Sequence, residues 1–228
     1  MAPQQIPLEL GHRPALGRAD FLITEANREA VSWIDSWPNW PAPVVGLHGP
    51  SGCGKSHLAA VFSAKANAYF LNVDEIENAN PLSLVKAHAA LVWDGAEAIV
   101  NEPSLFHLFN AVRELGKHFL IVGLTPPSRW PVKLPDLKSR LAGMPLVAMQ
   151  APDDATMSAV LIKVFRDRQV DVGPDVIEFV HKRIPRTFSA ILTFVDFIDR
   201  ESLAKNRKIS VPFVREVLNT KAIDFDQE

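Results

Sequence analysis

The sequence predicts an α/β protein: a domain with a five-stranded, mostly parallel sheet, followed by a small domain built only of helices. Three observations support this fold class. Short apolar runs typical of buried strands alternate with helical periodicity up to about residue 151. A phosphate-binding loop separates the first such run from the first long helix. Beyond Pro152 the pattern is helical throughout.

The α/β domain is expected to span residues 20–151, after an extended tail at 1–19. Thr24 is placed to cap its first helix. Strands are predicted at 44–47, 68–73, 89–94, 119–124 and 145–149, with a helix or loop at 81–87, a helix at 104–115 and a short helix carrying Arg140. We expect the strand 89–94 to lie beside the phosphate-loop strand.

The helical domain is expected to span residues 152–228. Asp153 and Thr187 can cap helices, while Pro174 and Pro212 suit first turns. The predicted helices cover about 153–168, 174–183, 187–204 and 210–218.

The phosphate-binding loop is Gly49-Pro50-Ser51-Gly52-Cys53-Gly54-Lys55-Ser56, which fits G-x-x-x-x-G-K-[ST] at every required position. Its glycines let backbone N–H groups face a polyphosphate, Lys55 brings a charge to the outer phosphates, and the Ser56 hydroxyl can bind Mg²⁺. A simple Gly/Ser turn would not require the Lys-Ser pair. We therefore assign residues 49–57, His57 included, to a site for ADP or ATP with Mg²⁺.

Asp94 ends a predicted strand and is the second expected Mg²⁺ ligand beside Ser56. A turn-initiating Asp-Gly is the competing interpretation. Many nucleotide hydrolases carry a second acid at the next position, but here it is Gly95, and Glu97 lies two residues further on. Hydrolysis by this chain alone is therefore expected to be weak. Thr125, at the tip of the strand 119–124, is a candidate phosphate sensor, although turn formation is the simpler role.

The composition excludes several other classes of protein. A formal net charge of −2 leaves no basic surplus, so contact with DNA is expected only through partners. The single cysteine, Cys53, rules out an internal disulfide. The charge of nearby Lys55 could lower the pKa of the Cys53 thiol and so activate it. We favour the simpler interpretation, in which Cys53 is a small side chain tolerated in the loop. The chain contains no long apolar run, so we expect a cytoplasmic protein without membrane contact.

The tail contains Gln5-Ile6-Pro7-Leu8-Glu9-Leu10, a glutamine followed by apolar residues at alternate positions. An extended peptide of this kind can place Ile6, Leu8 and Leu10 in pockets of a partner protein. On the pattern alone, an ordinary cluster of tail residues is the better interpretation.

The chain resembles the Hda family of DnaA-related AAA+ proteins in two segments: from Thr125-Pro126-Pro127 through Leu134–Leu141, and Lys208–Leu218. The resemblance implies an AAA+ domain with a helical lid. It implies that Gln5–Leu10 docks on the β sliding clamp, and that Arg140 is an arginine finger directed at ATP held by DnaA. It also implies that Arg186, in Pro185-Arg186-Thr187-Phe188, senses phosphate.

The chain departs from the DnaA pattern at two positions. An aspartate is usual where Leu124 or Thr125 stands here, and the second acid is missing at Gly95. Both departures remove groups that sense or hydrolyse a γ-phosphate, so we expect the chain to bind ADP. The adenine pocket is expected to include Phe21 and Leu22. The resemblance implies that the protein represses re-initiation of chromosome replication. A second copy of the chain is one expected partner, in a homo-oligomer. Two alternatives remain: a self-sufficient P-loop ATPase and a helicase-loader-like AAA+ protein.

Overall fold

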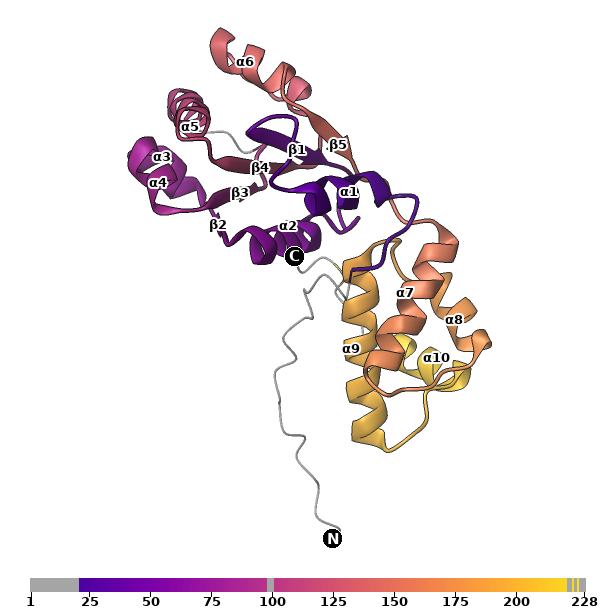
Figure 1. Cartoon of the computed structure of the whole chain (residues 1–228). Helices are drawn as coiled ribbons and strands as arrows, with labels where there is room; N and C mark the ends of the chain where they lie inside the picture. The colour runs from indigo at the N-terminus through magenta and orange to yellow at the C-terminus, as the bar shows by residue number, and fades with distance from the viewer. Residues whose placement is uncertain (1–20, 98–100, 221–222, 224, 226–228) are drawn as a thin grey trace. The chain divides into compact units, whose positions relative to one another are not determined.

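The computed structural model describes residues 21–97, 101–220, 223 and 225 (Figure 1). The chain divides into two compact units, one reaching from Leu16 to Ala151 and the other containing Pro152–Glu228. We call these the α/β unit and the lid unit. In the part of the chain that the structure describes, no helix is long and apolar enough to cross a membrane.

The α/β unit is built on a single sheet in which every neighbouring pair of strands is parallel. The strands lie in the order β2-β3-β4-β1-β5. Their bounds are β1 Val44–His48, β2 Ala68–Phe70, β3 Ala90–Asp94, β4 His118–Gly123 and β5 Leu146–Ala148. The predicted five-stranded parallel sheet is confirmed. The predicted neighbour of the phosphate-loop strand is wrong, because β4 lies between β1 and β3.

Helices cover both faces of this sheet, since alternate residues of each strand point to opposite faces. Val92 and Val122 pack with helices α1 and α2, whereas Leu91 and Ile121 pack with α3 to α6 on the other face (Figure 1). The bounds are α1 Arg28–Ser36, α2 Lys55–Ala66, α3 Val73–Asn78, α4 Pro81–Ala87, α5 Glu102–Glu114 and α6 Pro135–Ala142. The phosphate-loop strand is thereby buried between two helical layers.

Two local predictions in this unit are wrong. The N-cap position of the first helix is Asn27, not Thr24, and the Asn27 side chain makes no hydrogen bond to the first turn; it instead accepts one from the Thr24 N–H at 2.9 Å. The strand expected at 68–73 ends at Phe70, because Asn72 and Glu75 form a reciprocal capping box that begins α3.

The lid unit consists of four helices in its described residues: α7 Asp154–Asp167, α8 Pro174–His181, α9 Phe188–Lys205 and α10 Val211–Thr220. The predicted caps are confirmed, since Asp153 accepts a hydrogen bond from Thr156 N–H at 2.7 Å and Thr187 from Ala190 N–H at 3.1 Å. Their amphipathic faces meet around Phe165, Phe194 and Phe213, which are fully buried.

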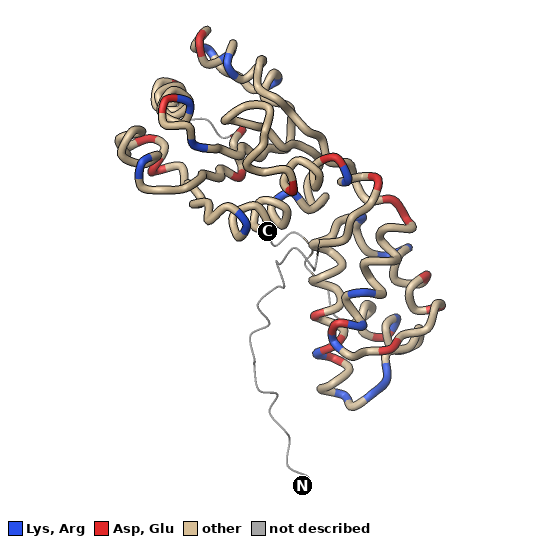
Figure 2. The backbone as a smooth tube through the Cα atoms, in the orientation of Figure 1, with Lys and Arg blue, Asp and Glu red and all other residues tan. Residues whose placement is uncertain are grey.

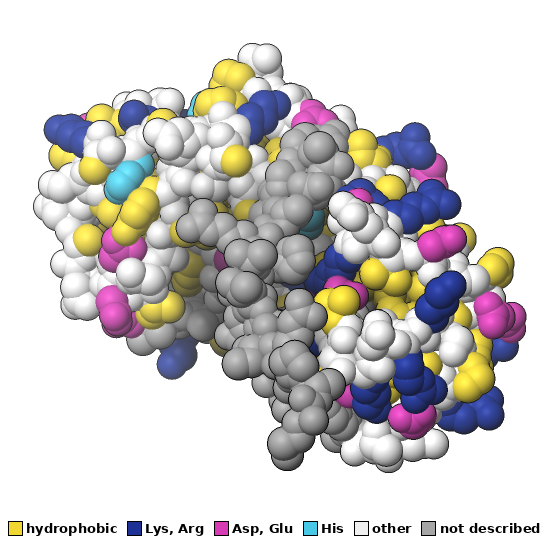
Figure 3. Space-filling view, turned by 90° about the horizontal axis from the view of Figure 1, so that it is seen from below, with side chains coloured by type: hydrophobic (Ala, Val, Ile, Leu, Met, Phe, Trp, Pro, Cys, Tyr) yellow, Lys and Arg dark blue, Asp and Glu magenta, His cyan; other side chains and the backbone are white. Residues whose placement is uncertain are grey.

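Charged residues are mixed along the backbone of each unit (Figure 2). On the face shown in Figure 3, basic side chains lie among acidic ones and scattered apolar side chains. This mixture agrees with the formal net charge of −2 and provides no broad basic face there for the backbone of DNA.

Candidate functional site

The phosphate-binding loop connects the carboxyl end of β1 to the first turn of α2, as the sequence predicts. Gly52 and Gly54 have φ angles of +68° and +96°, a region that side-chain-bearing residues avoid. A Cβ atom on Gly49 would lie 2.3 Å from the backbone oxygen of Met149, so only glycine fits. Because Gly54 is the N-cap residue of α2 and provides no side chain, N–H groups of the first turn remain suited to an anion.

Lys55 is buried at the base of this loop, with an exposed fraction of 7%. Its ammonium donates a hydrogen bond to the Pro50 carbonyl oxygen at 2.8 Å. It also lies 3.9 Å from the Cys53 sulfur. Burial nevertheless raises the pKa of the Cys53 thiol, although the neighbouring Lys55 charge opposes this effect. Cys53 is therefore a small core side chain, and the alternative of an activated thiol is wrong.

The segment before α1 lies against the phosphate-loop helix. The ring of Phe21, which is buried, meets the ring of His57 edge to face, with 5.0 Å between centroids. Asn27 fixes this segment by donating a hydrogen bond to the Leu22 carbonyl oxygen at 2.9 Å. Three predicted cofactor residues, Phe21, Leu22 and His57, thus come together in one unit. A helix-capping pattern alone does not predict that the Asn27 side chain fixes the segment before α1.

Positive charge gathers at the carboxyl ends of β1 and β4. The pKa of His48, the last residue of β1, is lowered by burial and further by the charges of Arg129 and Lys55. Arg129 comes from a 3₁₀ turn, Pro127–Arg129, that follows β4. Lys55 and Arg129 thus disfavour a further positive charge on His48, and the two cations favour an anion at this edge of the sheet.

Asp94 lies at the carboxyl end of β3, where its register partner is Val122 of β4. Ser56 lies in the first turn of α2 and is exposed. One carboxylate and one hydroxyl suit Mg²⁺, which completes its octahedron with water and phosphate oxygens. In the residues that the structure describes, no cluster of three or more His, Cys, Asp or Glu could hold a metal by itself. Bound Mg²⁺ would neutralise phosphate charge, with Ser56 and Asp94 as protein ligands.

Glu97 lies three residues after Asp94, and its carboxylate contacts the backbone just beyond the end of β4. Its carboxylate accepts a hydrogen bond from the Leu124 N–H at 2.8 Å, across 27 positions of sequence. Gly123 leaves room for this carboxylate, because a Cβ there would lie 2.8 Å from Glu97 Oε2. The Thr125 carbonyl oxygen accepts a hydrogen bond from the Trp130 indole at 3.1 Å, so the backbone of Thr125 is part of the turn.

Arg140 lies in the last turn of α6 and is half-buried against α5. Its guanidinium donates a hydrogen bond to Asn110 Oδ1 at 3.0 Å and lies 5.8 Å from the centroid of the Phe106 ring. No ion pair to Arg140 is present among the described residues. Its charge is thus held in place by neutral partners. The contacts of Arg140 with Asn110 and Phe106 could not be predicted from local sequence patterns, because these residues lie about thirty positions away.

Arg186 of the lid unit has a different environment. Its guanidinium pairs with Asp154 at 3.0 Å, and both side chains are more than half exposed. Asp154 also lies 3.2 Å from His181 Nε2. Arg186 is therefore available to solvent but already shares a carboxylate.

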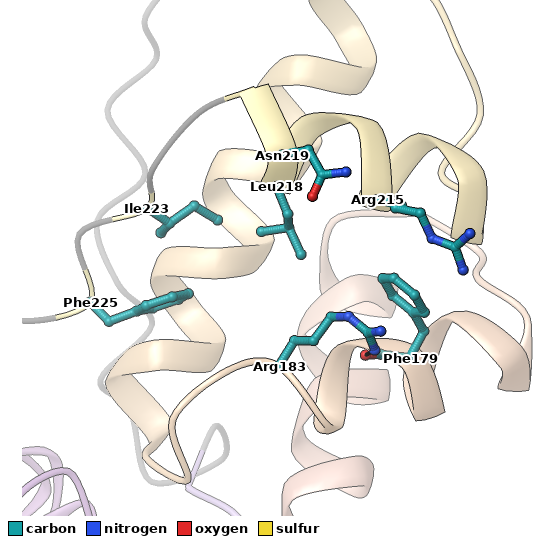
Figure 4. Close-up of a pocket in the computed structure, with 7 residues that line it drawn as sticks. All are labelled: Phe179, Arg183, Arg215, Leu218, Asn219, Ile223 and Phe225. Carbon is teal, nitrogen blue, oxygen red and sulfur yellow. Dashed lines mark hydrogen bonds between the residues drawn. The ribbon is translucent and has the colours of Figure 1, made fainter.

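A separate cavity of about 310 Å³ lies in the lid unit between α8 and α10 (Figure 4). Arg183 stacks on the Phe179 ring at 3.6 Å from its centroid, and Arg215 lies 5.4 Å from the same ring. None of the predicted nucleotide residues lines this cavity. The predicted clamp-binding residues Gln5, Ile6, Leu8 and Leu10 lie outside the described residues.

A phosphate loop on a parallel sheet of this strand order, followed by four helices in the described part of the lid unit, is the AAA+ fold. The AAA+ likeness extends to solved structures. Domain III of DnaA from Thermotoga maritima gives a TM-score of 0.78 at 14% identity, covering 91% of this chain and 97% of that domain. DnaA from Aquifex aeolicus bound to AMPPCP gives 0.71 at 18% identity, covering 86% and 68%. The RuvB branch migration motor of T. maritima gives 0.71 at 16% identity, covering 92% and 73%.

Within this class the lid is the distinctive part. Residues 153–218 match the family model of the Hda lid domain. An uncharacterized protein of Haemophilus influenzae is 26% identical over 192 residues, covering 78% of this chain and 82% of that protein. The lid unit therefore resembles the Hda lid domain, and the fold of the chain is that of DnaA domain III, as the sequence predicts.

Proposed function

We propose that this chain is an ADP-binding regulator of replication initiation that stimulates hydrolysis of the ATP bound to DnaA. Bound to the β sliding clamp, it would direct Arg140 at the nucleotide of the partner and so repress re-initiation. The observation that carries this proposal is the environment of Arg140: the guanidinium is positioned by Asn110 and Phe106, and no described acid neutralises it.

An arginine supplied in trans acts on the transition state of phosphoryl transfer. Water attacks the γ-phosphorus of the ATP on DnaA, and the bond to the β–γ bridging oxygen breaks to give ADP and phosphate. Negative charge on the transferring group is stabilised by the guanidinium, which is worth roughly 10³–10⁵ in rate in comparable systems. Because Asn110 already restricts the Arg140 side chain, less conformational entropy is lost when it enters the partner site.

The chain's own nucleotide would have a structural role. Gly52, Gly54 and Lys55 suit the α- and β-phosphates, and Mg²⁺ would use Ser56 and Asp94. Gly95 provides no carboxylate to orient an attacking water. The AMPPCP complex of the A. aeolicus DnaA supports nucleotide binding by a protein of this fold. Arg186 is the lid residue proposed to reach phosphate.

The tail motif would deliver the protein to its place of action. Gln5, Ile6, Leu8 and Leu10 are proposed to occupy a groove on the clamp, so that Arg140 meets DnaA only after the clamp has been loaded on DNA.

The proposal is tested by measuring hydrolysis of DnaA-bound ATP with this protein, ADP and DNA-loaded clamp. We expect stimulation that requires all three. Gln5→Ala combined with Leu8→Ala should abolish capture by immobilised clamp and the stimulation together, while ADP binding persists. Clamp capture that is unchanged in this variant would contradict the role of the tail. ATP turnover by the isolated chain that matches the stimulated rate would contradict the regulatory role.

A further inference from the structure

The cavity between α8 and α10 is built around an aromatic ring with two arginines against it (Figure 4). The Arg183 guanidinium lies 3.6 Å from the centroid of the Phe179 ring, and the Arg215 guanidinium lies 5.4 Å from it. Arg183 also donates a hydrogen bond to the Phe179 carbonyl oxygen at 2.9 Å. These contacts restrict both arginine side chains, so less conformational entropy is lost when a ligand binds them.

Neither of these guanidiniums forms an ion pair with an acid of the described residues. The acids next to the cluster in sequence are paired with other cations. Glu178 lies 2.6 Å from Lys182, and Glu216 lies 2.7 Å from Arg207. Because a guanidinium carries five N–H donors, most donors of the two arginines remain available to an acceptor that enters the cavity.

The rest of the lining is mostly apolar. Leu218 projects from α10, and Ile223 and Phe225 follow this helix in the chain. In Figure 4 these last two side chains lie on the opposite side of the cavity from Arg215. The cavity thus has a cationic side and an apolar side. Its volume of about 310 Å³ is at the lower end for ligand sites and suits the side chains of a short peptide.

An extended peptide matches both sides when its residues alternate in type, because successive side chains of an extended chain point in opposite directions. Its acidic side chains then meet the guanidiniums, while its apolar side chains meet the apolar wall. The chain's own sequence from position 223 shows this alternation, Ile-Asp-Phe-Asp-Gln-Glu, and its first and third residues line the cavity. Residues 224 and 226–228 lie outside the described residues.

We propose that this cavity is a docking site for a peptide segment of a partner protein in which apolar and acidic residues alternate. Arg183 and Arg215 bind its carboxylates, and its apolar side chains pack beside Leu218. Single-stranded nucleic acid is less suited, because its backbone carries a charge at every nucleotide and requires a longer basic groove than two arginines provide. The inference concerns the lid unit and rests on neither the nucleotide site nor Arg140.

The test measures fluorescence anisotropy of the labelled peptide Ile-Asp-Phe-Asp-Gln-Glu with the full chain. We expect saturable binding that weakens roughly 5- to 25-fold in Arg183→Gln combined with Arg215→Gln, because each exposed ionic contact contributes up to about fivefold. Arg200→Gln combined with Lys208→Gln is the matched control. Both positions are exposed and outside the cavity, and the net charge changes equally, so this variant should bind the peptide like the wild type.

Other occupants of the cavity are separate outcomes of the same experiment. A peptide with its acids replaced by asparagine and glutamine should bind more weakly, and equal binding would contradict recognition of carboxylates. Displacement of the acidic peptide by oligothymidylate would assign the cavity to nucleic acid. Binding seen only in Phe225→Ala would show that the chain's own end fills the cavity. Each of these three results overturns the inference, as does equal binding by the paired-arginine variant and its control, or no binding at all.

Discussion

The two arginines predicted to meet phosphate lie in contrasting environments. Arg140, in the α/β unit, is half-buried, and its guanidinium is held by the amide of Asn110 and the ring of Phe106. Arg186, in the lid unit, is two-thirds exposed and shares the Asp154 carboxylate. One cation has neutral partners and the other has an acidic one.

This difference bears on what each arginine can do. When a guanidinium leaves a carboxylate to bind phosphate, the net free energy of binding is only the difference between the two ionic interactions. A guanidinium held by an amide and a ring gives up no ion pair, and its planar fork remains charged at any working pH. The environment of Arg140 therefore suits action on a partner's nucleotide, and that of Arg186 suits an exchangeable contact.

Among substitutions that leave both arginines in place, replacing Asn110 by aspartate should produce the largest change, because it gives Arg140 an acidic partner like that of Arg186. The side chains are nearly isosteric, and Asn110 Oδ1 lies 3.0 Å from the guanidinium. A charge-assisted hydrogen bond of about 1.5–3 kcal/mol would then compete with the transition state, so stimulated hydrolysis should fall roughly 10- to 150-fold. Single-turnover hydrolysis of DnaA-bound ATP measures this effect.

Asn110→Ala is the matched control, since it removes the positioning contact without adding a charge. A neutral hydrogen bond of about 0.5–1.5 kcal/mol predicts a loss of only about 2- to 10-fold. If Asn110→Ala impairs stimulation as much as Asn110→Asp, the neutral environment of Arg140 is not what matters.

The converse change, Asp154→Asn, frees Arg186 and should have a smaller effect. Exposed ion pairs contribute about 0–1 kcal/mol, so affinity for ADP should rise by at most about fivefold. Isothermal titration of wild type, Asp154→Asn, Arg186→Ala and the double variant measures it. Asp154→Asn should have no effect in the Arg186→Ala background, and a persistent gain there would show that Asp154 acts through another group.

Lowering the pH should destabilise the fold without discharging either arginine. Burial lowers the pKa of His118, and burial with nearby cations lowers that of His48. The unfolded chain therefore binds more protons than the folded chain below about pH 6.5, the ordinary histidine pKa, so stability should fall as pH falls from about 7 to 5. The free energy of unfolding, measured in urea, should depend less steeply on pH in His118→Gln than in the wild type. This holds even if the variant is less stable at pH 7.

Much of the fold could be predicted because local signals agree with it. The apolar runs, the glycine loop and the caps at Asp153 and Thr187 each reflect interactions within a few residues. The capping box of Asn72 and Glu75 is also local, and its Asn-x-x-Glu spacing could have predicted α3. The start of the first helix was predicted too early at Thr24, because a sequence locates helix ends only to within a few residues and the helix begins after Asn27.

The remaining site features depend on contacts between distant segments. Sequence order does not reveal that β4 separates β3 from β1, and only this arrangement brings Glu97 to Leu124. The contact of Asn110 with Arg140 likewise joins two helices about thirty positions apart. Motif spacing predicted the phosphate loop and the family resemblance drew attention to Arg140, but neither predicted the residues that contact them.

The proposed arginine finger is tested most directly by single-turnover hydrolysis of DnaA-bound ATP in the presence of DNA-loaded clamp, ADP and either wild-type protein or Arg140→Ala. ADP and clamp binding by the variant serve as controls for its folding. We expect Arg140→Ala to lose roughly 10³-fold or more of the finger-dependent acceleration while both binding activities persist. Stimulation by Arg140→Ala equal to that of the wild type would contradict it.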